Sequence, residues 1–334
     1  MLWNVAVSAP NLSLVNRLAD GAFHSGEALA ATLGVSRTAV WKQLNRLQED
    51  YGLAVESVKG RGYRIPGGLE LLEAPRIREA LSARSRHLLG ELLIEPVLDS
   101  TNAEALRRLA AGSPPGFCCS AELQTAGRGR RGRPWVSPFA RNLYLSLTWE
   151  YEGGAAALEG LSLAVGVAVV RALESLGIRG MQLKWPNDLL FHGAKLGGIL
   201  LEMVGDAAGP CQVVVGVGLN VHMPAGVAAS IDQSWTDLRS LAGDQLPGRN
   251  HLLAALLDQL LPLLAGFGAS GFAPWREAWM SLDAYAGAPV VISSGDFRQA
   301  GTARGVDPRG ALQLETSLGV QPVYGGEVSL RPAS

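Results

Sequence analysis

The chain has 334 residues, of which 48% are hydrophobic and 18% are charged, and its formal net charge at pH 7 is −1. These values are ordinary for a soluble globular protein of two or three domains, and the net charge by itself indicates no partner. Three cysteines, none of them in a C-x-x-C pair, argue against a disulfide framework or a zinc site and suit a reducing compartment such as the cytoplasm.

The first segment, residues 1–66, has the pattern of a helix-turn-helix. No basic region precedes its first apolar residues, so we expect no signal peptide. An amphipathic helix is predicted to end at Gly21. Two short helices follow, for which Ser25 and Ser36 are suitable N-caps, and Gly34 is a suitable stop between them. Two short helices joined by a tight glycine-containing turn are typical of this motif.

The second of these helices and the hairpin after it form a candidate DNA-binding surface. The helix has an apolar face and a polar face that could enter a major groove, and the hairpin has a basic turn typical of a wing that contacts phosphates. Residues 1–66 hold seven basic and five acidic residues, a balance of +2. The residues expected to contact DNA are Ser36, Arg37, Thr38, Trp41, Lys42, Asn45, Lys59 and Arg61. A protein-contacting domain of the same shape is the alternative.

The rest of the chain divides into two further segments after a proline- and glycine-rich stretch, residues 65–75, that predicts a linker. Residues 67–283 mix buried strand patterns, NLYLSLTW and CQVVVGVGLNVHM, with helical patterns, LEGLSLAVGVAVVRALESLG and NHLLAALLDQLLPLLAGF. The apolar run LSLAVGVAVV is shorter than the about 20 residues that span a bilayer, so we expect no membrane segment. From residue 284 onward, the four short strands PVVIS, RQAGTARGV, ALQLET and PVYGGEVSLR predict a small β-barrel.

The stretch GRGRRGRPW, residues 127–135, satisfies the G-x-G-x-x-G pattern of dinucleotide-binding turns. Such a turn needs a helix directly after it, and Pro134 and Pro138 argue against one. Four arginines within six residues instead predict a mobile loop that is costly to order alone and folds over phosphate groups. A solvated basic loop that contacts nucleic acid is the alternative from charge alone.

Five other short motifs lie in the second segment: LDSTN, AELQ, KWPND, KLGGIL and GVGLN. Together with GRGRRGRPW they resemble, in the same order, the motifs of the biotin protein ligases. The helix-turn-helix and the terminal GGEVSLR extend the resemblance over nearly the whole chain, to the bifunctional ligases that also repress the biotin operon. One departure is Pro134, which stands before the loop tryptophan where a charged or polar residue is common, and it removes no key group.

The resemblance implies a fold of the α/β (α+β) class in three domains. These are a winged helix-turn-helix over residues 1–66, a mixed-sheet catalytic domain of the biotin/lipoate ligase type over residues 67–283, and an SH3-like β-barrel over residues 284–334. It also implies a two-step reaction, in which biotin and MgATP give biotinyl-5′-AMP and a lysine of the biotin carboxyl carrier protein then takes the biotin. Biotinyl-5′-AMP would also act as the corepressor of a homodimer on operator DNA.

Roles for individual residues follow from the same resemblance. Implied at the biotin site are Ser100, Thr101, Asn102, Gln124, Arg128, Gly129, Arg130, Lys195 and Gly198. Implied at the ATP and adenylate site are Arg128, Arg130, Arg131, Trp135, Lys184, Asn187, Asp188, Asn220 and Arg331. Arg128, Lys195 and Lys184 would act on the reacting groups, and Asp188 would lie near a Mg²⁺ ion carried mainly by ATP.

Local alternatives stay open for several of these residues, and so do other functions. Ser100 to Asn102 could simply cap a helix, Trp135 could be core, Lys184 could be a solvated strand-end lysine and Asn187 only a turn former. A biotin-sensing regulator without ligase activity and a ligase for lipoate or another acid are the rival functions. A nicotinamide oxidoreductase rests on the glycine pattern alone.

Overall fold

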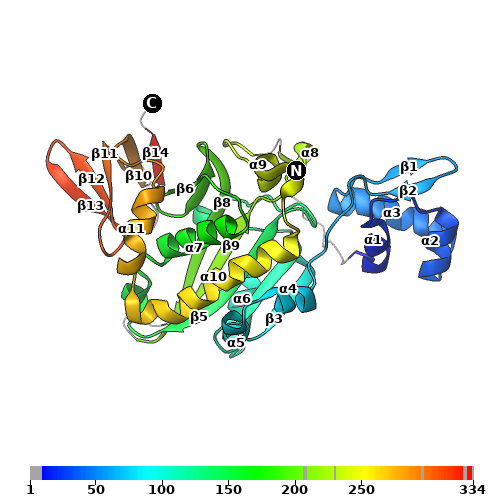
Figure 1. Ribbon diagram of the computed structural model, residues 1–334, viewed down its shortest axis with the longest axis horizontal. Coiled ribbons are helices and arrows are strands. Elements are labelled where there is room, and N and C mark those ends of the chain that lie inside the picture. The colour runs from blue at the N-terminus through cyan, green and yellow to red at the C-terminus, as the bar shows by residue number, and fades with distance from the viewer. Residues whose placement is uncertain (1–9, 206–208, 229–230, 295–296, 326–328, 333–334) are drawn as a thin grey trace.

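A computed structural model describes residues 10–205, 209–228, 231–294, 297–325 and 329–332. A helical lobe, a central sheet covered by helices, and a small C-terminal sheet follow one another along the molecule (Figure 1). This arrangement confirms the predicted fold class. The signal-peptide expectation concerns residues 1–9, and part of the last predicted strand falls on residues 326–328, so both lie outside the described residues.

The helical lobe is the predicted winged helix-turn-helix. Its elements are α1 Leu12–Leu18, α2 Gly26–Leu33, α3 Arg37–Tyr51, β1 Glu56–Val58 and β2 Gly62–Arg64. Both predicted serine caps accept a backbone N–H from the first turn of their helix, and Gly34 has the left-handed φ of 65°. The first helix ends at Leu18 rather than at Gly21, because the Asp20 side chain accepts the Ala22 N–H and starts a turn.

The predicted linker is docked between the lobe and the central domain. It contains no helix or strand up to Glu73. Ile65 is fully buried in the core of the lobe, and Leu72 belongs to the core of the central domain. From the central domain Phe139 enters the core of the lobe, where its ring meets Tyr51 at the end of α3 edge-on, with 5.4 Å between centroids. The two domains therefore share one packed boundary.

A buried ion pair holds the other side of this boundary. Arg249 Nη2 lies 2.7 Å from Glu122 Oε2, with both side chains almost fully buried, as a charge contact rather than an aligned hydrogen bond. The same carboxylate accepts the Leu72 N–H at 2.5 Å, and the guanidinium donates to the carbonyl oxygens of Glu70 and Asn142. The pair thereby fastens residues 70–72 to the sheet.

The central domain is a seven-stranded mixed sheet of order β3-β4-β5-β9-β8-β7-β6. Only β3 and β4 pair in parallel. The strands are β3 Leu92–Leu98, β4 Cys118–Gln124, β5 Leu143–Tyr151, β6 Met181–Lys184, β7 Asp188–Phe191, β8 Ala194–Gly205 and β9 Cys211–Leu219. Because side chains alternate along a strand, Cys118 packs with the large core on one face and Cys119 packs with α6 on the other.

Helices cover both faces of the sheet. The α-helices are α4 Ala74–Ala80, α5 Ala83–Leu88, α6 Thr101–Ala110, α7 Leu161–Ser175, α8 Ala225–Ala228, α9 Leu238–Ala242, α10 Arg249–Ser270 and α11 Ala273–Leu282, and the 3₁₀ turns are η1 Arg130–Gly132, η2 Gly154–Leu158 and η3 Gly243–Gln245. Two helical stretches, Gly154–Ser175 and Arg249–Ser270, are long and apolar enough to span a membrane. The length of the apolar run LSLAVGVAVV had not predicted this. Both have more than half of that window buried, as core helices do.

The C-terminal domain is a five-stranded antiparallel sheet of order β13-β12-β11-β10-β14. Its strands are β10 Pro289–Ser294, β11 Phe297–Val306, β12 Leu312–Thr316, β13 Gly319–Val323 and β14 Ser329–Pro332. The single last strand predicted over 322–331 is wrong. The chain leaves β13 at Tyr324, and β14 pairs with β10 at the other edge of the sheet, so the two parts lie at opposite edges and cannot form one strand.

Candidate functional site

A cavity of about 720 Å³ opens on the central sheet and brings nearly all the predicted site residues together. Those that line it are Ser100, Thr101, Asn102, Gln124, Arg128, Gly129, Arg130, Arg131, Trp135, Lys184, Asn187, Asp188, Lys195, Gly198 and Arg331. Asn220 is the exception. Its buried amide donates to the carbonyl oxygens of Thr236 at 3.0 Å and Lys195 at 3.5 Å, so it ties the start of α9 to β8.

One end of the cavity is built on the N-terminus of α6. Ser100 takes the N-cap position, but its hydroxyl makes no capping hydrogen bond. The Thr101 N–H is bonded instead to Gln124 Oε1 of β4 at 2.9 Å. The alternative that this stretch caps a helix is therefore confirmed for the position of Ser100, although its hydroxyl makes no capping hydrogen bond.

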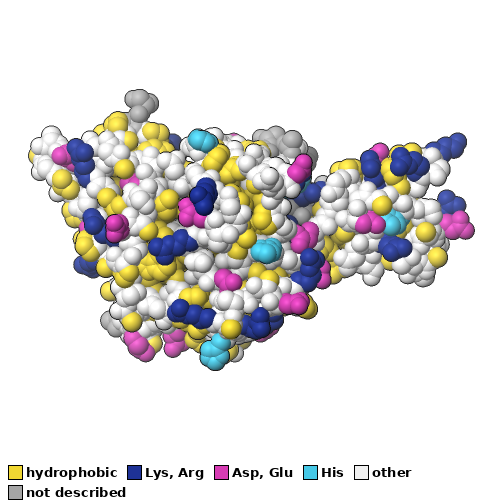
Figure 2. All heavy atoms as spheres, viewed as in Figure 1, with side chains coloured by type: hydrophobic (Ala, Val, Ile, Leu, Met, Phe, Trp, Pro, Cys, Tyr) yellow, Lys and Arg dark blue, Asp and Glu magenta, His cyan; other side chains and the backbone are white. Residues whose placement is uncertain are grey.

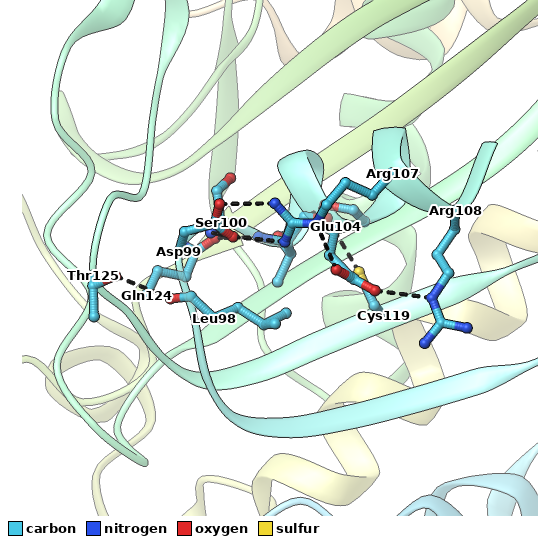
Figure 3. A network of polar contacts seen from close by, with 11 residues as sticks. Leu98, Asp99, Ser100, Glu104, Arg107, Arg108, Cys119, Gln124 and Thr125 are labelled. Carbon is cyan, nitrogen blue, oxygen red and sulfur yellow. Dashed lines mark hydrogen bonds and ion pairs between the residues drawn. The ribbon is translucent and has the colours of Figure 1, made fainter. Parts of the chain in front are cut away.

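Charge pairs on the outer side of α6 hold this end in place (Figure 3). Arg107 reaches back along the helix and binds both oxygens of Asp99 at 2.9 and 2.8 Å. The hydrogen bonds from Arg107 lower the pKa of Asp99 below its ordinary value. Glu104 binds Arg107 and Arg108 together. These ion pairs hold α6 in place, so the polar residues at its start have fixed positions, which suits precise contacts with a ligand.

The arginine loop closes on itself as a hairpin over the cavity. Trp135 N–H donates to Gly127 O and Gly129 N–H donates to Arg133 O, both at 2.8 Å. A short 3₁₀ turn, Arg130–Gly132, forms the tip, and the chain after it is extended. Without a helix after the glycines, the dinucleotide-binding interpretation is wrong. That a ligand orders the loop stays a prediction.

Trp135 packs against two glycines of the sheet. A Cβ atom on Gly218 would come within 2.6 Å of the indole, so a glycine is needed there to leave room for the ring, and one on Gly198 would come within 3.3 Å, a tight contact. Lys195 Nζ lies 5.5 Å from the ring centroid. The indole N–H is buried without a partner among the described residues. Trp135 is therefore a half-buried wall of the cavity rather than part of a closed core.

The opposite end of the cavity is cationic. Asp188 lies between two lysines, 2.7 Å from Lys195 Nζ and 3.3 Å from Lys184 Nζ. Burial alone would raise the pKa of Asp188, but the two ammonium groups outweigh it and hold the pKa below its ordinary value. Lys184 is therefore an ion-paired residue of the cavity and not a solvated one.

Two further cationic residues differ in how they are held. Arg130 donates to Asn187 Oδ1 at 3.1 Å, and the Asn187 amide donates to Ile199 O at 2.8 Å, so Asn187 does more than form a turn. Burial lowers the pKa of Arg130. Arg331 reaches the cavity wall from β14 of the C-terminal domain.

Several residues of the site carry no sequence motif. Among them are Ser146, Glu202, Asp232 and Gln233. Glu202 accepts a hydrogen bond from Asn102 at 2.7 Å and lies 3.4 Å from Arg128. The period of two along β8 places it on the same face as Gly198 and Leu200, and this alternation was the available signal. Asp232 and Gln233 lie in a loop without any such pattern.

The predicted DNA-binding residues lie on the outer surface of the helical lobe. Arg37, Thr38, Trp41 and Lys42 are exposed along α3, whereas Asn45 is half-buried and Ser36 is used as the helix cap. Basic side chains stand at the outer tip of the β1–β2 hairpin (Figure 2). In the wing Lys59 is exposed, and the Arg61 guanidinium stacks on Phe23 with 4.1 Å to the ring centroid.

Three family profiles match the chain in order. They are the HTH domain over residues 12–64, the Biotin/lipoate A/B protein ligase family over residues 95–220, and the Biotin protein ligase C terminal domain over residues 287–331. Among solved structures, the biotin protein ligase from Aquifex aeolicus in complex with biotin and ATP matches 73% of this chain and 100% of that one, with a TM-score of 0.62 and 27% identity.

Relatives of known function match almost the entire chain. The bifunctional ligase/repressor BirA of Salmonella typhimurium is 42% identical over 322 residues, which cover 96% of this chain and 98% of that protein. The protein of the same name from Escherichia coli is also 42% identical and is covered to 97%. Identity at this level, with all three domains in the same order, shows that the chain belongs to the family of the bifunctional ligase/repressor BirA.

Proposed function

We propose that this protein is an ATP-dependent biotin protein ligase that also represses transcription of biotin genes. The observation that best supports this proposal is the polarity of a single cavity. One end, at Ser100 to Asn102, is polar and neutral, and the other end, around Lys195 and Lys184, is cationic. Biotin has the same polarity, with a neutral ureido ring at one end and a carboxylate at the other. ATP would bring its phosphates to the cationic end.

The chemistry needs charge stabilisation and positioning rather than a nucleophile of the protein. In the first step a biotin carboxylate oxygen bonds to the α-phosphorus of ATP, and pyrophosphate leaves as the anhydride bond breaks. Lys195 and Arg128 would stabilise the charge that develops on the phosphoryl oxygens. In the second step the amine of a carrier-protein lysine bonds to the acyl carbon, AMP leaves, and the nitrogen loses a proton.

The two lysines are prepared for this task by Asp188. While no nucleotide is bound, the carboxylate pairs with both lysine side chains and holds them at the cavity. The residues described include no cluster of three or more metal-binding side chains. Asp188 alone would approach a Mg²⁺ ion, which fits an ion that enters bound to the phosphates of ATP and retains most of its ligands from them. Such an ion would add positive charge beside the phosphates.

Biotin-dependent exchange of labelled pyrophosphate into ATP tests the first step directly. We expect exchange that requires biotin and does not occur with lipoate. Exchange driven by lipoate would assign the site to a different acid. A well-folded protein without any exchange would leave a biotin-sensing regulator as the function.

DNA binding is proposed for the exposed faces of α3 and the wing. Replacing Lys42 with alanine is expected to reduce the slope of log K against log salt concentration by about 1, because one phosphate contact is lost. Fluorescence anisotropy with duplex DNA at several salt concentrations would measure this slope. The matched control is Arg84→Ala, exposed on α5 of the central domain, which should leave the slope unchanged. Equal slopes for the wild type and Lys42→Ala would remove α3 from the interface.

We further propose that biotinyl-5′-AMP is the corepressor and that the adenylate-bound chain forms a homodimer on operator DNA. Two winged helices on a palindrome double the DNA contacts of one. The dimer partner and the carrier protein would compete for the same surface. Saturating carrier protein should therefore reduce adenylate-induced dimerisation in sedimentation velocity runs, and unchanged dimerisation would exclude the competition. Three reduced, buried cysteines suit the cytoplasm, where both partners would be met.

A further inference from the structure

A continuous chain of polar contacts starts at the arginine loop, crosses the floor of the cavity and returns to the same loop. Its members are Arg128, Glu202, Asn102, Ser146, Thr101, Gln124, Ser137 and Trp135. From the cavity floor back to the loop, Gln124 Nε2 donates to Ser137 Oγ at 3.1 Å, and Ser137 Oγ donates to the Trp135 carbonyl at 3.0 Å. The polar residues at the start of α6 are thus connected to the arginine loop at both Arg128 and Trp135.

Glu202 fixes the direction of the hydrogen bonds in this chain. An ionised carboxylate only accepts, so the Asn102 amide must turn its NH₂ group to Glu202 Oε2, at 2.7 Å. Asn102 Oδ1 then faces the Ser146 hydroxyl, at 2.6 Å. The Leu200 carbonyl accepts from the same NH₂ group at 3.4 Å, so Glu202 is the closer of two acceptors that favour this orientation of the amide.

The orientation of the Asn102 amide also affects the hydrogen bonds of Thr101, which lines the cavity. The Ser146 hydroxyl also lies 2.8 Å from Thr101 Oγ1, but it has one proton and Asn102 Oδ1 has none. The Ser146 proton therefore goes to Asn102, and the single Thr101 hydroxyl proton goes either to Ser146 Oγ or to Gln124 Oε1, which lies 3.2 Å from Thr101 Oγ1. Thr101 is left with free lone pairs, which suits a ligand N–H such as those of a ureido ring.

We infer that Glu202 is a positioning residue of the ligase, which sets the hydrogen-bond polarity of the biotin end and links it to Arg128 of the loop. The inference rests on the proposed function, because the ligand that Thr101 meets is taken to be biotin. Arg128 Nη2 lies 3.4 Å from Glu202 Oε1, so one carboxylate contacts both the Asn102 amide and the arginine loop. Glu202 itself need not touch the ligand.

Replacing Glu202 with glutamine tests this role, because the side chain keeps its size but can donate as well as accept. We expect Glu202→Gln to raise the biotin Kd and the KM for biotin about tenfold, the usual effect of a mispaired buried polar group. A variant that is merely less stable would lower kcat through its active fraction and leave KM unchanged. The matched control is Glu150→Gln, whose carboxylate is exposed on β5 and accepts from Gln212 at 3.1 Å.

A double-mutant cycle with Ser146→Ala separates the hydrogen-bond chain from independent effects. Ser146 and Glu202 both bond to Asn102. If Asn102 transmits the polarity, the double variant should bind biotin about as weakly as the weaker single variant, rather than at the product of both losses. Isothermal titration calorimetry measures the four affinities, and the cycle of Ser146→Ala with Glu150→Gln should be multiplicative.

Three results would overturn the inference about Glu202. The first is a biotin affinity of Glu202→Gln like that of the wild type, and the second is a multiplicative double variant. Should Glu202→Gln fail to fold, Glu202→Asp keeps a carboxylate that only accepts and should combine with Ser146→Ala non-multiplicatively, so a multiplicative result there is the third. Absence of biotin-dependent exchange in the wild type would instead overturn the proposed function.

Discussion

Replacing Lys195 with alanine is expected to lower biotin-dependent ATP–pyrophosphate exchange by about 10²- to 10³-fold, the usual cost of removing one preorganised group that stabilises developing charge. Lys195 Nζ lies 2.7 Å from Asp188 and 5.5 Å from the Trp135 ring centroid, so it is held inside the cavity before any substrate arrives. Its removal also leaves the Asp188 carboxylate with Lys184 alone, which makes this end of the cavity less favourable for phosphates.

The exchange assay should be run at saturating biotin and ATP, so that weaker substrate binding does not account for the loss. Arg179→Ala is a suitable control, because Arg179 is exposed before β6 and does not line the cavity. Exchange by Lys195→Ala within a factor of a few of the wild type would show that the acyl-phosphate step does not depend on this group. A melting temperature equal to that of the wild type would confirm that the variant is folded.

Replacing Arg249 with alanine is expected to lower the free energy of unfolding by about 3–5 kcal/mol, because it leaves a buried carboxylate without its partner. Glu122 is only 4% exposed and would retain the Leu72 N–H as its remaining close contact. The lost guanidinium also leaves the carbonyl oxygens of Glu70 and Asn142 without their donor. The winged lobe should therefore loosen from the central domain.

Urea unfolding followed by circular dichroism, together with limited proteolysis of residues 65–73, would measure both effects. Arg304→Ala is the control, since its ion pair with Glu315 is about half exposed and should contribute at most about 1 kcal/mol. If the two variants lose the same stability, the buried pair does not hold the boundary. If Arg249→Ala is much less stable but equally resistant to the protease, the pair stabilises the sheet without fastening the linker.

The accuracy of the sequence-based predictions depends on how far apart the interacting residues lie. The side chains of Ser25 and Ser36 cap the first turn of their own helices, so a few neighbouring residues were sufficient to predict these caps. The loop after Gly127 was correctly separated from dinucleotide-binding turns, because nearby prolines argue against a following helix. By contrast, the division of the last strand into β13 and β14 depends on which edge of the five-stranded sheet each part joins.

The same distinction applies to the site. Short sequence motifs were sufficient to predict the loop arginines and the lysines at strand ends, since each motif is a short run of residues that must fit close to a ligand. The same motifs indicated the family. Glu202 and Asn102 are 100 positions apart, and Arg249 and Glu122 come from different halves of the central domain. Burial makes such polar partners necessary, because an unpaired charge in the interior costs several kcal/mol. Which residues become partners is settled only when the sheet brings β4, β5, β8 and the helices on its two faces together.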